Sequence, residues 1–192
     1  MNPEINQPLP KAYSAIQEAT HASGFTMASD ILTCSMLRTL ARSKSPGKFL
    51  ELGTGTGLAT AWILDGITQD STLVSLDNDA TLIGIAKKFL TSDWRLSLIY
   101  QDGGQWIEQN KLQRFDFIFA DTWPGKYFHL DDAISLLNHG GLYIIDDMLP
   151  QPNWPEGHEQ KVESLTEQLE KRNDLQLTKL NWATGIIIAA KI

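Results

Sequence analysis

The sequence has little of several features that mark particular classes of protein. Cys34 is its only cysteine, so an internal disulfide is excluded and a small buried thiol in a reducing compartment is expected. The chain has no run of lysine and arginine, and its formal net charge of −7 argues against an extended nucleic-acid or anionic-membrane surface. No apolar run reaches membrane-spanning length, and the N-terminus lacks a basic-then-apolar signal pattern. The composition therefore predicts a cytoplasmic protein.

The length of 192 residues suits one domain with a full hydrophobic core. Residues 1–10 are polar and contain three prolines, which predicts a loose or docked arm. Apolar spacing predicts two helices next, at 11–22 and at 31–40, the second capped by Ser29 or Asp30. We expect a single domain, 1–192, in which residues 1–46 form a helical N-terminal cap and residues 47–192 form an α/β core.

Short apolar runs alternate with amphipathic segments through the rest of the chain. The predicted strands cover residues 49–52, 73–76, 96–100, 115–120, 142–145, 175–182 and 185–192. The predicted helices cover residues 58–67, 81–90, 106–110, 130–137 and 159–172, and a hairpin turn is expected at 183–185. This alternation favours a mostly parallel sheet with helices on both faces.

The segment FLELGTGTGLAT, residues 49–60, predicts a strand, a glycine turn and a helix in direct succession. Gly53, Gly55 and Gly57 allow a tight turn, and without side chains a ligand can lie against the main chain and the helix start. The spacing is G-x-G-x-G and not the dinucleotide spacing G-x-G-x-x-G. A plain strand-helix turn with no ligand is the alternative interpretation.

Glu51 lies two places before the first glycine, and its charge distinguishes between a phosphate-containing ligand and a positively charged one. An acid at this point would repel a pyrophosphate and attract an ammonium group. S-adenosylmethionine carries an ammonium and a sulfonium and no phosphate. The pattern E-x-G-x-G-x-G therefore resembles motif I of the class I S-adenosylmethionine-dependent methyltransferases, and it speaks against an NAD-dependent oxidoreductase, which remains an alternative.

Five of the predicted strand ends carry acidic residues, at the edge of the sheet where ligands bind in parallel α/β folds. These acids are Glu51, Asp77, Asp102, Asp121 and the pair Asp146 and Asp147. Asp77 lies about twenty residues beyond the glycines, where a carboxylate can accept hydrogen bonds from both ribose hydroxyls. Asp102 is expected near the adenine, or as a turn residue before Gly103. Helix capping is the alternative role for any of these acids. The residues expected to bind the cofactor are Glu51, Gly53, Thr54, Gly55, Gly57, Asp77, Asn78, Asp102, Gly103 and Asp121.

Asp121, Asp146 and Asp147 follow two strands that are expected to be neighbours. Three carboxylates would repel one another unless they are protonated or bridged by a cation. Ligation by oxygen alone suits Mg²⁺ or Ca²⁺, and such an ion can bind a substrate hydroxyl and lower its pKa. We therefore predict a divalent metal site at these three aspartates, with binding of an amine and helix capping as alternatives.

Two further segments resemble the catechol O-methyltransferase and caffeoyl-CoA O-methyltransferase group. FDFIFADTWPGKY, residues 115–127, is similar to the family's strand that ends in a metal-binding aspartate, and Trp123 and Tyr127 match a tryptophan and a tyrosine of the catechol enzyme. GGLYIIDDM, residues 140–148, resembles the strand ending in the family's Asp-Asn metal pair, with Asp147 where the family has asparagine. Residues 27–30 resemble the stretch that closes over the methionine part of the cofactor.

The resemblance departs at one catalytic position, because Pro124 stands where the family has its lysine and Lys126 is the nearby candidate. The resemblance implies a Rossmann-like doubly wound fold: seven strands, an antiparallel last strand and a helical N-terminal cap. It implies methyl transfer from S-adenosylmethionine to oxygen of a small hydroxylated acceptor, with Asp121 and Lys126 in the chemistry. Trp123, Tyr127 and Trp154 are the expected walls of the acceptor pocket.

Two other interpretations stay open at this stage. One is metal-independent methyl transfer to nitrogen or another acceptor, and the other is an S-adenosylmethionine-binding protein without catalysis. For all of them the expected partner is a small molecule and not a membrane or an extended nucleic acid. Related metal-dependent enzymes are often dimers, so a homodimer is one expectation for the assembly.

Overall fold

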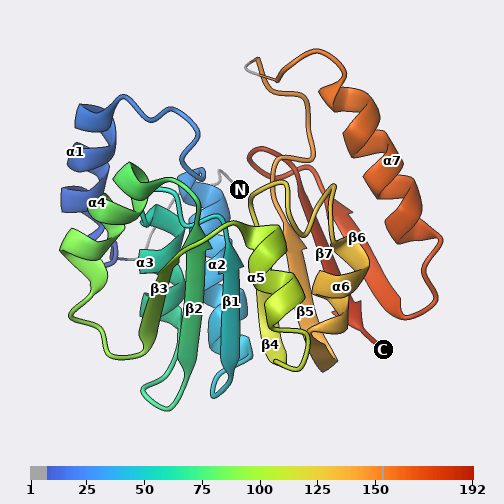
Figure 1. Ribbon diagram of the computed structural model, residues 1–192, viewed down its shortest axis with the longest axis horizontal. Coiled ribbons are helices and arrows are strands. Elements are labelled where there is room, and N and C mark those ends of the chain that lie inside the picture. The colour runs from blue at the N-terminus through green and yellow to red at the C-terminus, as the bar shows by residue number, and fades with distance from the viewer. Residues whose placement is uncertain (1–7, 153) are drawn as a thin grey trace.

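The computed structural model describes residues 8–152 and 154–192, so the predicted arm at 1–10 lies largely outside the described residues. Strands and helices alternate along the chain as predicted (Figure 1). The helices are α1 Tyr13–Ser23, α2 Ile31–Ser43, α3 Leu58–Gly66, α4 Ala80–Leu90, α5 Gly103–Gln109, α6 Leu130–Ser135 and α7 His158–Glu170. The strands are β1 Lys48–Leu52, β2 Thr72–Asp77, β3 Leu96–Tyr100, β4 Phe115–Ala120, β5 Leu137–Ile145, β6 Leu175–Leu180 and β7 Ile186–Lys191.

The seven strands form one sheet in the order β3-β2-β1-β4-β5-β7-β6. Pairing is parallel from β3 to β5, whereas β7 runs antiparallel to both β5 and β6. The predicted Rossmann-like sheet with a reversed last strand is therefore confirmed. The strand order reverses between β1 and β4, and in such sheets the carboxyl ends of these strands border a ligand crevice.

Buried apolar side chains form two separate core clusters, one on each face of the sheet. One cluster packs against α1, α2 and α3, and the other packs against α5, α6 and α7. The division follows from strand geometry, because successive side chains point to opposite faces. In β1, Leu50 and Leu52 pack toward α5 to α7, while Phe49 packs on the opposite side. Glu51 alternates onto the face of Phe49, where α3 lies.

The N-terminal cap is attached to the glycine turn by polar contacts as well as by its apolar stripes. Thr20 of α1 donates a hydrogen bond to the hydroxyl of Thr56, at 2.7 Å, and both side chains are buried. Asp30 caps α2 by accepting from the backbone N–H of Leu32 at 2.7 Å. The segment between α1 and α2 is thereby held over the carboxyl ends of the strands (Figure 1).

Several predicted boundaries were wrong, most clearly around β5 and α5. The helix predicted at 130–137 ends at Ser135, and β5 begins at Leu137 and continues through the glycine pair that was expected to precede it. Pairing of Leu137 with Phe115 across the sheet, together with a register shift before Phe117, extends the strand. The helix predicted at 106–110 begins earlier, at Gly103, because the Asp102 carboxylate accepts from the backbone N–H of Gln105.

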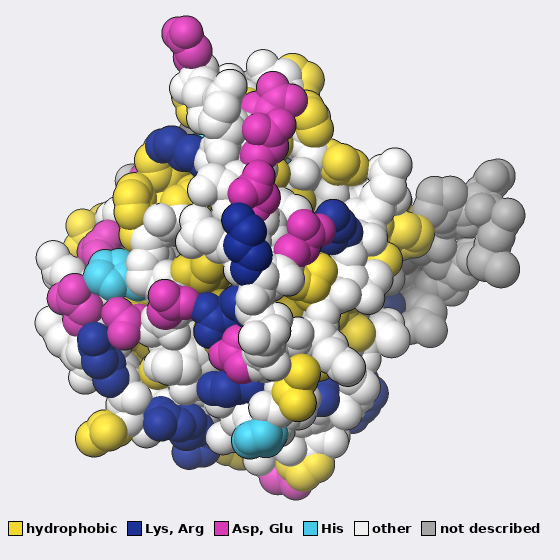
Figure 2. All heavy atoms as spheres, turned by 90° about the vertical axis from the view of Figure 1, so that its right-hand side faces the viewer, with side chains coloured by type: hydrophobic (Ala, Val, Ile, Leu, Met, Phe, Trp, Pro, Cys, Tyr) yellow, Lys and Arg dark blue, Asp and Glu magenta, His cyan; other side chains and the backbone are white. Residues whose placement is uncertain are grey.

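Helix α7 has an apolar stripe and a charged outer face. His158, Val162, Leu165 and Leu169 are buried at helical spacing, as predicted for an amphipathic helix. Acidic and basic side chains mingle on the face of the molecule that carries α7 (Figure 2). Within the described parts of the chain, every helix is too short or too polar to cross a lipid bilayer.

Candidate active site

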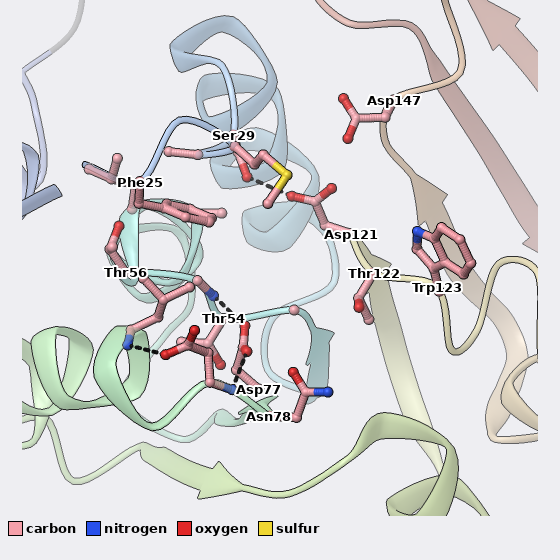
Figure 3. A pocket seen from close by; sticks show the side chains of 18 of the residues that line it. Phe25, Ser29, Thr54, Thr56, Asp77, Asn78, Asp121, Thr122, Trp123 and Asp147 are labelled. Atoms are coloured by element: carbon pink, nitrogen blue, oxygen red, sulfur yellow. Dashed lines mark hydrogen bonds between the residues drawn. The ribbon is translucent and has the colours of Figure 1, made fainter. Parts of the chain in front are cut away.

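A cavity of about 600 Å³ lies over the carboxyl ends of β1, β2 and β4 (Figure 3). Its floor is the glycine turn after β1, and Asp77 and Asn78 border it after β2. Residues 23–25 and 27–29 of the N-terminal cap close one side, and Asp121 with its two successors closes another. This is the position at which a doubly wound sheet binds its ligand.

Gly53 and Gly57 are required by the backbone geometry of the turn. Gly53 has φ +100°, and a Cβ there would lie 2.6 Å from the carbonyl oxygen of Asp121. Gly57 has φ +94°, and a Cβ there would lie 2.9 Å from a side-chain methyl of Leu90 in α4. Gly53 therefore lets β1 and β4 converge beneath the cavity. Gly57 lies outside the cavity lining and serves the packing of α3 against α4.

Asp77 ends β2 with its carboxylate held by the turn. Its Oδ2 atom accepts from the backbone N–H of Gly55 at 2.8 Å, and its Oδ1 atom accepts from the N–H of Asp79 at 2.9 Å. Each carboxylate oxygen can accept a second hydrogen bond. Because Asp77 is only partly buried and lines the cavity, these remaining acceptor sites are available to a ligand's hydroxyl groups.

Glu51 lies beneath the cavity and does not line it. Its side chain has no exposed surface, and Ser75 and Thr60 donate hydrogen bonds to one carboxylate oxygen, Oε2. The other oxygen, Oε1, has no hydrogen-bond partner among the described residues. Burial raises the pKa of Glu51 from its ordinary value of 4.5 to about 7, and the two hydroxyl donors only partly offset this.

Replacement of Glu51 by glutamine is expected to alter how stability of the ligand-free protein depends on pH. Below pH 4.5 the carboxyl is protonated in both states; as pH rises toward about 7 it ionises only in the unfolded state. The wild type therefore loses about 3 kcal/mol of unfolding free energy across this window, and Glu51→Gln does not. Urea denaturation of both proteins at pH 4.5 to 8 measures the difference. Parallel curves for the two proteins would contradict the assignment.

Asp121 follows β4, and its carboxylate is partly buried, with 12% of the side chain exposed. Ser29 of the cap donates to its Oδ2 atom at 2.9 Å (Figure 3). Nζ of Lys126 lies 3.8 Å from its Oδ1 atom. Burial, and after it the negative charge of Asp146, raises the pKa of Asp121 well above the usual carboxylate range. The sequence prediction placed Asp121 at this edge of the sheet, and Ser29 belongs to the stretch 27–30 that was expected to close over the methionine part of the cofactor.

Asp146 and Asp147 directly follow β5, beside Asp121. Asp146 is buried, and its Oδ1 atom accepts from the hydroxyl of Thr184 and from the backbone N–H of Asp147. Burial, followed by repulsion from Asp147, raises the pKa of Asp146 to about 6. Asp147 is partly buried and has a left-handed backbone, with φ 58°. The three predicted aspartates therefore reach one region of the structure.

A second cavity, of about 220 Å³, adjoins the first and is bordered by all three aspartates. Asp121, Asp147 and Ser29 are among the residues that line both cavities. Trp154, which the sequence placed in an acceptor pocket, lines only the smaller cavity. The two spaces thus meet at Asp121, with the glycine turn on one side and the loop before α7 on the other.

Aromatic rings form a wall along the two cavities: Trp123 and His158 border both, Trp154 borders only the smaller and Tyr127 only the larger. Trp123 and Tyr127 meet edge to face at 5.9 Å, and the ring of Trp154 lies 4.6 Å from that of His158, centroid to centroid. The hydroxyl of Tyr127 lies 3.1 Å from Nε2 of His158, and burial, then Asp147, raises the pKa of Tyr127 to about 12. The sequence predicted three residues of this wall and missed the fourth, His158. Its place four residues before Val162 on the buried stripe of α7 was the available signal.

Not every predicted cofactor residue reaches a cavity. Asp102 caps α5 and Gly103 packs under Pro124, so neither borders the larger space. Thr54 borders it and also hydrogen-bonds to Ser75 at 2.6 Å. Met27, Ala28 and Ser29 of the cap border it and belong to the stretch 27–30 that was expected to close over the cofactor. Three other bordering residues of the cap had not been predicted: Ser23, Gly24 and Phe25.

Sequence comparison connects this site to known proteins. A family profile described as O-methyltransferase matches residues 14–192. An inferred O-methyltransferase of Mycolicibacterium vanbaalenii is 25% identical over 116 residues, which are 58% of this chain and 51% of the relative. The chain thus spans about half the length of the curated relatives that it matches.

Solved structures resemble the chain over nearly its whole length. The O-methyltransferase from Bacillus cereus in complex with S-adenosylhomocysteine has a TM-score of 0.83 at 20% identity and covers 98% of this chain and 94% of its own. TomG from Streptomyces achromogenes, an O-methyltransferase of tomaymycin synthesis in complex with S-adenosylmethionine, has a TM-score of 0.81 at 19% identity, with 97% and 92% covered. At these identities the likeness establishes the shared fold.

Proposed function

This chain belongs to the O-methyltransferase family, and from that premise we propose that it transfers the methyl group of S-adenosylmethionine to a hydroxyl oxygen of a small, catechol-like acceptor. The observation that carries the proposal is the meeting of two cavities at Asp121. The larger space suits a nucleoside cofactor, and the smaller one, with its aromatic wall, suits a flat acceptor. Family membership disfavours the NAD-dependent oxidoreductase.

Three features of the larger cavity fit S-adenosylmethionine. The backbone at Gly53 to Gly55 offers a surface without side chains, and Asp77 has free acceptor sites for ribose hydroxyls. Glu51 does not line the cavity, but its unpaired Oε1 atom lies beneath the floor and would favour a positively charged group above it, such as the cofactor's ammonium. When bound, the cofactor would supply a methyl group already activated by its sulfonium.

In the proposed reaction the acceptor oxygen attacks the methyl carbon, the bond from carbon to sulfur breaks, and its electron pair stays on sulfur. The hydroxyl proton must leave, and Asp121 is the proposed acceptor. Its carboxylate borders both cavities. Its raised pKa makes it a stronger base toward a hydroxyl proton than an ordinary carboxylate. The remaining contribution of the protein is to hold the two reactants in line.

The predicted divalent metal fits the chemistry of the donors but not their arrangement. Carboxylate oxygens suit Mg²⁺ or Ca²⁺. Across residues 8–152 and 154–192, however, no three His, Cys, Asp or Glu side chains are grouped so that they could hold an ion. Asp121 faces Lys126, and Asp146 is turned toward Thr184. We therefore assign no step of the proposed reaction to a metal.

One observation favours a second acceptor class. The smaller cavity is bordered by three aspartates, and no lysine or arginine borders it within the described chain. Such a cavity would attract a cationic amine, so N-methylation of an amine is the second candidate function. Parallel assays with catechols and with aromatic amines separate the two candidates.

The proposed function is tested first by titrating the protein with S-adenosylhomocysteine in a calorimeter and then by assaying methyl transfer from labelled S-adenosylmethionine. We expect stoichiometric binding and methylated product from a catechol panel. Binding with no product from catechols, simple phenols or amines would favour the catalytically silent alternative. An absence of binding would contradict the assignment of the larger cavity.

A further inference from the structure

The loop after β4 is folded so that Lys126 returns to the site. Gly125 has φ +87°, and a Cβ there would lie 2.6 Å from a methyl group of Leu52, so the turn needs glycine. The carbonyl oxygen of Gly125 accepts from the buried hydroxyl of Tyr143 at 2.6 Å. Pro124, at the position of the family's lysine, pairs with Phe128 across this turn. The loop is thus fixed to the core at the residue before Lys126.

The ammonium group of Lys126 lies among the carboxylates and is shielded from water. Its side chain is 5% exposed, and Nζ is 3.8 Å from Oδ1 of Asp121. Its charge lowers the pKa of both Asp121 and Asp146, against the larger effect of burial. A buried ammonium needs a counter-charge nearby, and the partly buried carboxylate of Asp121 supplies it to Lys126.

Two further carboxylate oxygens of the cluster are engaged in hydrogen bonds. Oδ2 of Asp121 accepts from Ser29, and Oδ1 of Asp146 accepts from Thr184 and from the backbone of Asp147. A divalent ion at Asp121 would meet the ammonium group as a like charge at close range. The Lys126 ammonium and a divalent ion would therefore repel each other, and binding of one disfavours binding of the other.

We propose that Lys126 is the resident cation of this site and takes the place that a divalent ion would occupy, so that methyl transfer by this chain is independent of metal. The inference rests on the proposed function for its chemistry, and on the loop geometry for its placement. Lys126 borders the larger cavity beside Asp121, so in this proposal it stabilises the acceptor oxygen where the two cavities meet, as that oxygen loses its proton to Asp121. Lys126 does not itself act as the proton acceptor.

The test uses Mn²⁺ as a probe, because its electron paramagnetic resonance signal is lost when it binds protein oxygen ligands. Wild-type protein loaded with S-adenosylhomocysteine is expected to leave the Mn²⁺ signal unchanged at millimolar concentration. Lys126→Gln removes the ammonium and leaves the carboxylates facing one another. It is expected to bind Mn²⁺ at least about tenfold more tightly than the wild type. Lys126→Arg keeps the positive charge and is expected to behave as the wild type.

Tight Mn²⁺ binding by the wild type, abolished in Asp121→Asn, would overturn the proposal. So would a folded Lys126→Gln protein that gains no affinity for the ion. Lys126→Met offers a second neutral variant if the glutamine variant does not fold, and the wild-type titration tests the proposal without any variant. The binding heat of S-adenosylhomocysteine, measured on the same samples, reports separately on the proposed function.

Discussion

Replacing Asp77 by alanine is expected to weaken binding of S-adenosylhomocysteine by about 1,000-fold, because two hydrogen bonds from ribose hydroxyls to a charged acceptor are lost. The same change releases the backbone N–H of Gly55, which Asp77 holds at 2.8 Å. The glycine turn then loses its anchor to β2 as well. Asp77→Asn keeps one acceptor oxygen and should fall between the wild type and the alanine variant. Calorimetric titration measures all three affinities.

Asp102→Asn is the matched control for this prediction. The sequence placed Asp102 near the adenine, whereas its carboxylate caps α5 outside the larger cavity. Asparagine caps helices about as well as aspartate, so this variant should retain both stability and affinity. Equal losses of affinity in Asp77→Asn and Asp102→Asn would contradict the geometry described for the cavity.

Replacing Asp121 by asparagine is expected to lower kcat by a factor of about 100 to 10,000, the range attributed to a general base. Asparagine can still accept the hydrogen bond of Ser29, so the fold of the cap segment is preserved. Binding of S-adenosylhomocysteine should change much less than kcat. Steady-state kinetics with the best acceptor, combined with calorimetry, separates the two effects.

The pH dependence gives this prediction a second measurement. Deprotonated Asp121 is the active form, so kcat of the wild type should rise with pH through an apparent pKa above the usual carboxylate range. That limb should be missing in Asp121→Asn. Asp147→Asn, which places the resembling family's residue at this position, is the matched control and should keep the limb. A wild-type kcat that is flat from pH 5 to 8 would argue against Asp121 as the proton acceptor.

Local signals in the sequence were strong at the glycine turn and at the strand ends. Gly53 and Asp77 follow apolar strands whose type and order could be predicted from periodicity, and such strands end on one edge of a parallel sheet. The resemblance added the reversed last strand. Boundaries failed where pairing decided them, as at β5, which begins at Leu137 because it meets Phe115 across the sheet.

Side-chain direction and the closing of the site were decided only by the tertiary structure. Glu51 was expected at the ligand, but alternation along β1 turns it under the cavity toward Thr60 of α3. His158 joins the aromatic wall because α7 packs its buried stripe toward the sheet. Neither fact follows from spacing along the chain.

By itself, the sequence determined the fold class, the family and the set of acids at one edge of the sheet, because these depend on periodicity and on residues close together in the chain. The tertiary structure decided which of those acids border the cavities and which positively charged side chain lies beside Asp121. Lys126 lies five residues beyond Asp121, and no local pattern indicates that its ammonium returns to that carboxylate. The return depends on a turn fixed by Gly125 against Leu52 and Tyr143, which are residues of two other strands.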